Sequence, residues 1–234
     1  MTELVVVARP ADLARPAAEW LELEMARAIG ERGTCALALA GGHTPEPAYR
    51  ELARASSVDW RRVQVFFGDE RSVPPDHADS NYRMVQAALL SRVVIPAGQI
   101  HRMEAERADR DAAARDYERV MPPRLDILLL GIGPDGHTAS LFPGSPALDE
   151  RQRLVVPVLG AKPPAERMTI TPPVIEAARK VMVLASGGDK AAVVARALEG
   201  PLALQAVPAQ LARRGTWFLD QAAAARLTAP RITA

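Results

Sequence analysis

The sequence predicts an α/β fold with an open, mostly parallel, doubly wound sheet and helices on both faces. Short aliphatic runs alternate along the chain with longer amphipathic stretches. Several of the short runs are apolar on both faces, which is typical of parallel strands covered by helices on each side. In such a fold, ligands bind at the carboxyl ends of the strands.

The predicted strands are short and rich in aliphatic residues. Five of them are expected in the parallel sheet, at residues 4–7, 35–39, 63–67, 125–130 and 180–185. A further pair of strands is predicted at residues 154–159 and 167–171, and His101 is placed in another short strand.

Amphipathic helices are predicted between the strands. They span residues 16–33, 45–55, 81–91, 107–121 and 190–198. Pro16 and Pro45 fit the first turn of a helix, where a missing N–H group does no harm. No repeat, charge block or Gly/Ser linker interrupts the alternation, so residues 1–234 are predicted to form a single domain.

Composition and charge argue against several classes of protein. The 29 basic and 28 acidic residues give a net charge of +1, so no overall field attracts nucleic acid or an anionic membrane. The sequence contains no apolar run long enough to span a bilayer and no signal peptide. The single cysteine, Cys35, rules out an internal disulfide and favours a reducing compartment. We expect a cytoplasmic protein, a monomer or weak homo-oligomer, with neither nucleic acid nor membrane as partner.

The loop after the second predicted strand is rich in glycine. Gly41 and Gly42 precede His43 and Thr44 at the start of a predicted helix. Adjacent glycines expose backbone N–H groups at a position where the helix dipole also favours an anion. A tight turn that needs positive φ is an equally good interpretation of the glycine pair alone.

The loop after the third predicted strand carries charged side chains. Asp69 could act on protons or hydroxyl groups, and Arg71 could clamp a carboxylate or a phosphate. Taken by itself, this segment fits a solvated loop with a surface ion pair better.

The most informative loop follows the strand at residues 125–130. It contains G-x-G-x-x-G, formally the dinucleotide fingerprint. That fingerprint needs a helix opening on the loop, whereas Pro134 removes an N–H and Pro143 limits any helix to less than two turns. We therefore expect no nucleotide cofactor. What remains is His137, an imidazole suited to general base catalysis near neutral pH, or else a histidine that merely bonds loop carbonyls.

Two basic residues late in the chain complete the candidate site. Arg167 begins the strand at residues 167–171, and Lys190 follows Ser186-Gly-Gly-Asp189 at a junction of strand, loop and helix. Glycines with a lysine at a helix start fit a phosphate contact, although the spacing is not that of a Walker A loop. No His or Cys cluster has metal-ligand spacing, so no metal site is expected.

Four sequence blocks together resemble the 6-phosphogluconolactonase family. They are residues 41–45, residues 66–73 with 79–81, residues 131–144 and residues 186–190. The resemblance implies a fold shared with glucosamine-6-phosphate deaminases and ribose-5-phosphate isomerases, without metal or nucleotide cofactor. It also implies hydrolysis of a sugar-phosphate lactone, 6-phospho-D-glucono-1,5-lactone, to 6-phospho-D-gluconate in the oxidative pentose phosphate pathway.

The candidate residues take roles in this reaction. His137 would be the base that activates water, and Asp69 is the second candidate catalytic residue. Basic residues would hold the 6-phosphate, as the resemblance implies. His43 departs from the small hydroxyl residue that the family often has, so its own contact is left open. The expected substrate-binding residues are Gly41, Gly42, Thr44, Arg71, Asn81, Asp135, Gly136, Arg167 and Lys190.

Two alternative functions stay open. Deaminases of the superfamily carry a related loop with an acidic residue shortly after the histidine, whereas residues 138–142 here contain no ionisable side chain, which favours the lactonase. A non-catalytic sugar-phosphate-sensing domain would share the phosphate loops without needing a base. Such sensors need an attached DNA-binding module, and a chain of 234 residues leaves little room for one.

Overall fold

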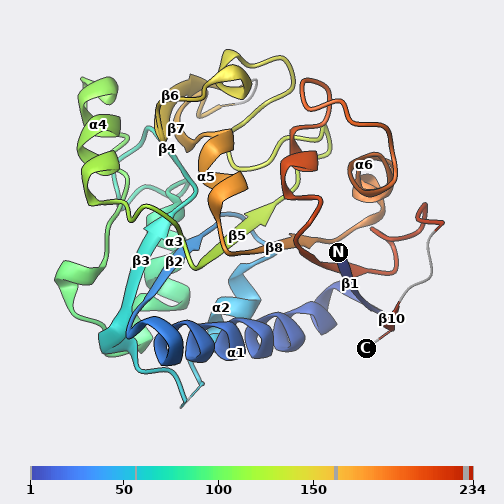
Figure 1. The fold of residues 1–234 in the computed structure, drawn as a ribbon, viewed down its shortest axis with the longest axis horizontal. Coiled ribbons are helices and arrows are strands. Elements are labelled where there is room, and N and C mark those ends of the chain that lie inside the picture. The colour runs from blue at the N-terminus through green and yellow to red at the C-terminus, as the bar shows by residue number, and fades with distance from the viewer. Residues whose placement is uncertain (1, 56, 161–162, 229–231, 234) are drawn as a thin grey trace.

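A parallel β-sheet forms the centre of the molecule (Figure 1). The computed structural model describes residues 2–55, 57–160, 163–228 and 232–233. The seven strands lie in the order β10-β1-β9-β8-β5-β2-β3, and all neighbouring pairs are parallel. They are β1 (Glu3–Val7), β2 (Cys35–Leu39), β3 (Val63–Phe67), β5 (Ile127–Gly131), β8 (Lys180–Ala185), β9 (Thr216–Asp220) and β10 (Ile232–Thr233).

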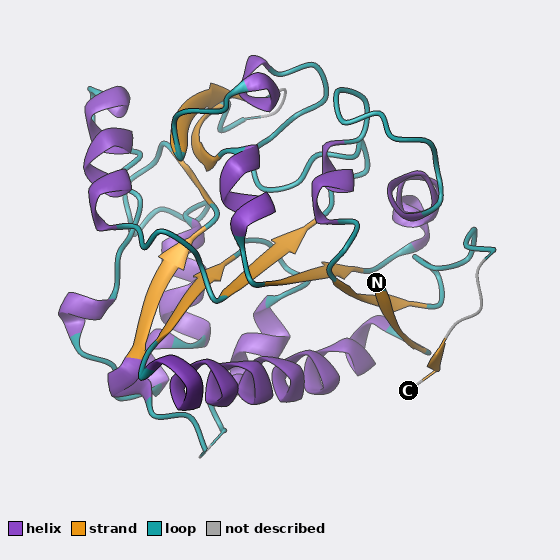
Figure 2. Ribbon diagram, viewed as in Figure 1, coloured by secondary structure: helices purple, strands orange, loops and turns teal. Residues whose placement is uncertain are grey.

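Helices cover both faces of this sheet (Figure 2). On one face, α1 (Ala14–Arg32) packs beside α2 (Glu46–Leu52), and α3 (Asn81–Ala88) adjoins α2. On the other face lie α5 (Pro172–Ala177) and α6 (Ala191–Leu198). The expected doubly wound α/β fold is confirmed. Among the described residues, no helix is long and apolar enough to cross a membrane.

A second, antiparallel sheet stands at the carboxyl end of β3. Its strands β4 (Asp69–Arg71), β7 (Glu166–Ile170) and β6 (Val155–Leu159) lie in that order. Helix α4 (Arg110–Val120) packs against β6. Gly68 joins the two sheets, because its N–H donates to the Leu39 carbonyl of β2 while its own carbonyl accepts the N–H of Ile170 in β7.

The second sheet corrects one expectation. Residues 69–71 were expected in a loop but form a strand, because they pair with β7 after the chain leaves the parallel sheet at Gly68. Arg167 was expected to begin a strand, and it is the second residue of β7. The predicted pair at residues 154–159 and 167–171 does form two paired strands, in this separate sheet.

Two further expectations at the parallel sheet were wrong or incomplete. His101 is not in a strand: only Ile100 forms an isolated bridge to Val65, and the His101 N–H donates to the Val65 carbonyl at 2.9 Å. Strand β9 was not predicted, because its apolar run contains only Trp217, Phe218 and Leu219. It becomes a strand by burial between β1 and β8, and all five of its residues are buried.

Candidate active site

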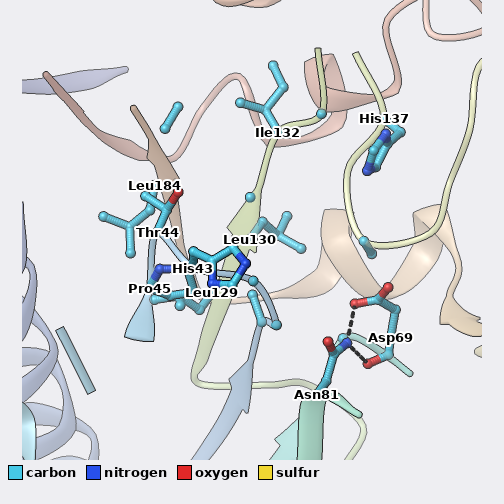
Figure 3. A pocket seen from close by; sticks show the side chains of 18 of the residues that line it. His43, Thr44, Pro45, Asp69, Asn81, Leu129, Leu130, Ile132, His137 and Leu184 are labelled. Atoms are coloured by element: carbon cyan, nitrogen blue, oxygen red, sulfur yellow. Dashed lines mark hydrogen bonds between the residues drawn. The ribbon is translucent and has the colours of Figure 1, made fainter. Parts of the chain in front are cut away.

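A pocket at the carboxyl ends of β2, β5 and β8 brings together most of the predicted site residues (Figure 3). Its volume is about 200 Å³. In Figure 3, His137 and the Asp69–Asn81 pair lie on one side of the view, with His43, Thr44 and Pro45 across from them. The predicted residues that line it are Gly41, Gly42, Thr44, Asp69, Arg71, Asn81, His137, Arg167 and Lys190.

His137 is oriented by the carboxylate of Asp135. The distance from its Nδ1 to Asp135 Oδ1 is 2.5 Å, and its side chain is 28% exposed. Partial burial raises the pKa of the Asp135 carboxyl, whereas the charge and the hydrogen bonds of His137 lower it. The lowering is larger, so the net shift of this pKa is downward. An ionised Asp135 accepts the imidazole proton on Nδ1, which leaves the lone pair of Nε2 available to accept a proton.

Asp135 and Gly136 do not line the pocket, although both were expected to bind substrate. Asp135 acts on the His137 ring instead. The N–H of Gly136 donates to the Gly133 carbonyl at 2.9 Å, which closes a turn and leaves that N–H unavailable to a ligand. Its φ of 95° and the Val207 backbone beside it explain the glycine. Gly136 therefore shapes the loop.

Asp69 connects the His137 loop to the second sheet. Its buried carboxylate accepts the Ser140 hydroxyl at 2.6 Å on Oδ2 and the Asn81 amide at 3.3 Å on Oδ1. Asn81 also donates to the Asp69 carbonyl at 2.8 Å (Figure 3). Ser140 follows His137 by three residues, so this network ties the His137 loop to β4. Ser140 was not predicted, because its role depends on a partner 71 positions away.

Glu70 is a second residue that the sequence analysis missed. Strand alternation turns it away from the face shared by Asp69 and Arg71. Its buried carboxylate accepts the N–H groups of Asn81 and Tyr82, each at 2.8 Å. Burial raises the pKa of Glu70 and these N–H groups oppose the rise. Glu70 thereby fixes the start of α3, where Asn81 enters the pocket.

Arg71 and Arg167 lie opposite each other on neighbouring strands of the second sheet. They are register partners in the antiparallel pair of β4 and β7. Arg71 donates to the Asp79 carbonyl at 2.6 Å and Arg167 to the Pro164 carbonyl at 3.1 Å, and neither forms an ion pair with a described carboxylate. Burial lowers the pKa of Arg167, and the electrostatic attraction of Asp69 partly offsets this lowering. Like charges directly opposite are unfavourable, so two such cations indicate an anion-binding site.

Lys190 and Phe142 border the same region. Lys190 reaches the pocket from the loop after β8 and donates to Asp189 at 2.6 Å. The Phe142 ring lies 4.8 Å from the His137 ring, and the Arg167 guanidinium sits 5.6 Å from its centroid. Phe142, which was not predicted as a site residue, therefore contacts both the candidate base and a candidate anion-binding group.

The loop after β2 presents free backbone donors. The N–H groups of residues 41–44 have no acceptor within the described part of the chain. Gly42 has a φ of 96°, which favours glycine. Gly41 has to be a glycine because the backbone passes close to the Asn81 side chain. A Cβ on Gly41 would lie 1.7 Å from Asn81 Oδ1. These donors could stabilise negative charge developing on a ligand.

Gly41→Ala is expected to displace Asn81 and with it the Asp69 network. We expect kcat/KM to fall about 10- to 100-fold, the range associated with a small displacement of a site. Steady-state kinetics and thermal unfolding would measure this. Gly30→Ala is the matched control, since a Cβ on Gly30 in α1 meets nothing within 4 Å and should leave kinetics unchanged. Equal kinetics for both variants would contradict the packing argument.

A metal site is not apparent in the described ranges. No group of three or more His, Cys, Asp or Glu side chains is arranged to hold an ion there. The pocket offers an oriented imidazole, backbone donors and basic side chains.

Comparison with known proteins identifies related sequences and structures. The family model of glucosamine-6-phosphate isomerases/6-phosphogluconolactonase matches residues 8–219. The 6-phosphogluconolactonase of Synechocystis is 41% identical over 86% of this chain and 88% of its own, and that of Rattus norvegicus is 42% identical over 86% and 84%. The structure of 6-phosphogluconolactonase from Trypanosoma brucei superposes with a TM-score of 0.87 at 29% identity, covering 97% of this chain and 99% of that one.

Proposed function

The chain belongs to the family of glucosamine-6-phosphate isomerases and 6-phosphogluconolactonases, and on that premise we propose that it hydrolyses 6-phospho-D-glucono-1,5-lactone to 6-phospho-D-gluconate. The enzyme is a carboxylic ester hydrolase acting on a lactone. The observation that carries the proposal is that one pocket holds both an oriented imidazole and two opposed arginines without a carboxylate partner among the described residues.

His137 is the proposed general base. Its Nδ1 bonds to Asp135, so Nε2 takes a proton from water while the water oxygen attacks C1 of the lactone. The C1–O5 bond then breaks, and the same proton passes to the departing ring oxygen. The new carboxylic acid ionises at neutral pH, and each turnover releases one proton to solution.

The backbone of the loop after β2 is the proposed oxyanion site. The N–H groups of Gly41 and Gly42 have no acceptor among the residues that the structure describes, and both glycines line the pocket. Each such donor contributes roughly 3–4 kcal/mol to stabilising a tetrahedral intermediate. Asp69, which its neighbours hold rigidly, is assigned to sugar hydroxyls and to positioning the His137 loop.

Arg71, Arg167 and Lys190 are the proposed phosphate ligands. All three line the pocket, and a phosphate dianion would relieve the repulsion between the opposed arginines. Binding the phosphate away from the reacting carbon orients the lactone against the base. We further propose that residues 1–234 act as one lactonase domain in the cytoplasm.

The family also contains deaminases, and the residues after His137 separate the two activities. Ring opening and proton shuttling in the deaminases use an acidic group there, while Thr138, Ala139 and Ser140 offer none. The Ser140 hydroxyl is already bonded to Asp69. Ester hydrolysis needs no further acid, so the lactonase is the function that this pocket supports best.

Proton release tests the proposal directly. Adding freshly generated 6-phosphoglucono-δ-lactone to the protein with EDTA present should release protons well above the spontaneous rate. Glucosamine 6-phosphate should yield no ammonia under the same conditions. If lactone hydrolysis stays at the spontaneous rate and ammonia appears, the chain is a deaminase. If neither occurs, a non-catalytic sugar-phosphate-binding role replaces the enzyme.

A further inference from the structure

Asp220 is a buried carboxylate that the proposed reaction does not use. It is the last residue of β9 and is fully buried. Oδ1 accepts the Ala223 N–H at 2.7 Å, and the Gly187 N–H lies 3.2 Å from each carboxylate oxygen. In the described part of the chain, these partners are all backbone groups. Burying a charge is costly unless strong donors satisfy it, so this carboxylate holds two backbone segments together.

Gly187 links Asp220 to the pocket. Strand β8 lies beside β9, with Ala185 opposite Leu219, so the chain leaves β8 next to Asp220. Gly187 has φ 95° and ψ 145°, a combination that is essentially restricted to glycine. Its carbonyl accepts the Lys190 N–H at 3.1 Å. The conformation of Gly187 therefore helps to set the position of Lys190, which directly precedes α6.

We propose that Asp220 is a positioning residue for Lys190. By holding the Gly187 N–H, it fixes the loop of residues 186–190 so that the Lys190 side chain enters the pocket. Ser186 and Lys190 line the pocket, whereas Asp220 does not. The inference rests on the proposed function, because it takes the substrate phosphate to be the group that Lys190 binds.

The two acceptor oxygens of Asp220 are essential to this role. A carboxylate offers only acceptors, so both of its oxygens can receive backbone N–H groups. In Asp220→Asn, the amide nitrogen replaces one oxygen and directs a donor toward a donor. Side-chain volume hardly changes, so the substitution loosens the loop without opening a cavity. The effect should appear in phosphate binding rather than in the chemical step.

Asp220→Asn is therefore expected to separate KM from kcat. With 6-phosphoglucono-δ-lactone, KM should rise about tenfold, and so should the inhibition constant of inorganic phosphate as a competitive inhibitor, while kcat stays within about threefold. Gly187→Ala should produce the same pattern without altering a charge, because a Cβ there is strained and would lie 2.8 Å from Asp189 Oδ1.

Asp126→Asn is the matched control. Asp126 is another buried carboxylate, which accepts the Ala36 N–H at 2.8 Å and pairs with Arg32, but it precedes β5 at the opposite end of the sheet. Its loss should lower thermal stability while KM and the phosphate inhibition constant stay at wild-type values. The same result for Asp220→Asn, a lower thermal stability with unchanged KM and inhibition constant, would overturn the positioning role.

Failure of the proposed function can be distinguished from failure of the positioning role. A wild-type protein that does not hydrolyse the lactone would refute that function. Calorimetric titration with inorganic phosphate then tests Asp220 alone: weaker binding by Asp220→Asn, with normal binding by Asp126→Asn, supports the positioning role. Equal binding by all three proteins, or none by the wild type, refutes it.

Discussion

His137→Ala is expected to lower kcat about 10²- to 10⁴-fold with little change in KM, the range for loss of a general base. The imidazole is held by Asp135 and is proposed to act on water, so its removal should affect the transition state more than the bound substrate. Asp135→Asn should have a smaller effect, because the ring remains but loses the partner that orients it. Proton-release kinetics would rank the three proteins, with circular dichroism confirming that each is folded.

The pH profile provides a second test of the same role. A general base must be unprotonated to act, so kcat/KM of the wild type should fall on acidification. The pKa of Asp135 is shifted downward, which favours the carboxylate form that orients the ring. Residual activity of His137→Ala should not show this fall. A flat wild-type profile, or an unaltered kcat in the variant, would remove His137 from the mechanism.

Five strands of the parallel sheet could be predicted from local sequence because each is a short, mainly apolar run. Four of them are buried along most of their length, and buried parallel strands show this pattern. β4 could not be predicted in this way: Asp69, Glu70 and Arg71 form an entirely charged strand that exists because it pairs with β7. Residues 69–71 and their partners in β7 are nearly one hundred positions apart in the sequence. The three residues alone therefore carry no signal of this pairing.

The candidate site, like the strands, could be predicted only in part from the sequence. Residues on loops after apolar strands, such as His137 and Lys190, could be placed because strand ends converge at one sheet edge. The donors and acceptors that hold these residues in position could not be predicted. Asp135 was predicted as a substrate contact because sequence shows its nearness to His137 but not the direction of its carboxylate. Asp220 went unnoticed because β9 itself was not predicted.

Arg71→Ala and Arg167→Ala are each expected to lower kcat/KM about 10²-fold, chiefly by raising KM. Both side chains are partly buried, so a phosphate bound between them is largely removed from water and each charge-assisted contact is strong. Arg15→Ala is the matched control. It removes the same charge from the molecule, but Arg15 is 85% exposed in a surface pair with Glu19. Its kinetics should equal those of the wild type.

The register of β4 and β7 makes a sharper test possible. Because Arg71 and Arg167 are direct cross-strand partners, one phosphate can contact both, and the two losses should not add. In the double variant, removing the second arginine should cost less than removing it from the wild type, with a coupling of about 0.5–3 kcal/mol. Without phosphate, losing one arginine relieves repulsion with the other, so thermal stability should hardly fall while KM rises. Additive effects on kcat/KM would mean that the arginines bind different groups, and a fall in kcat at constant KM would place them at the reacting carbon.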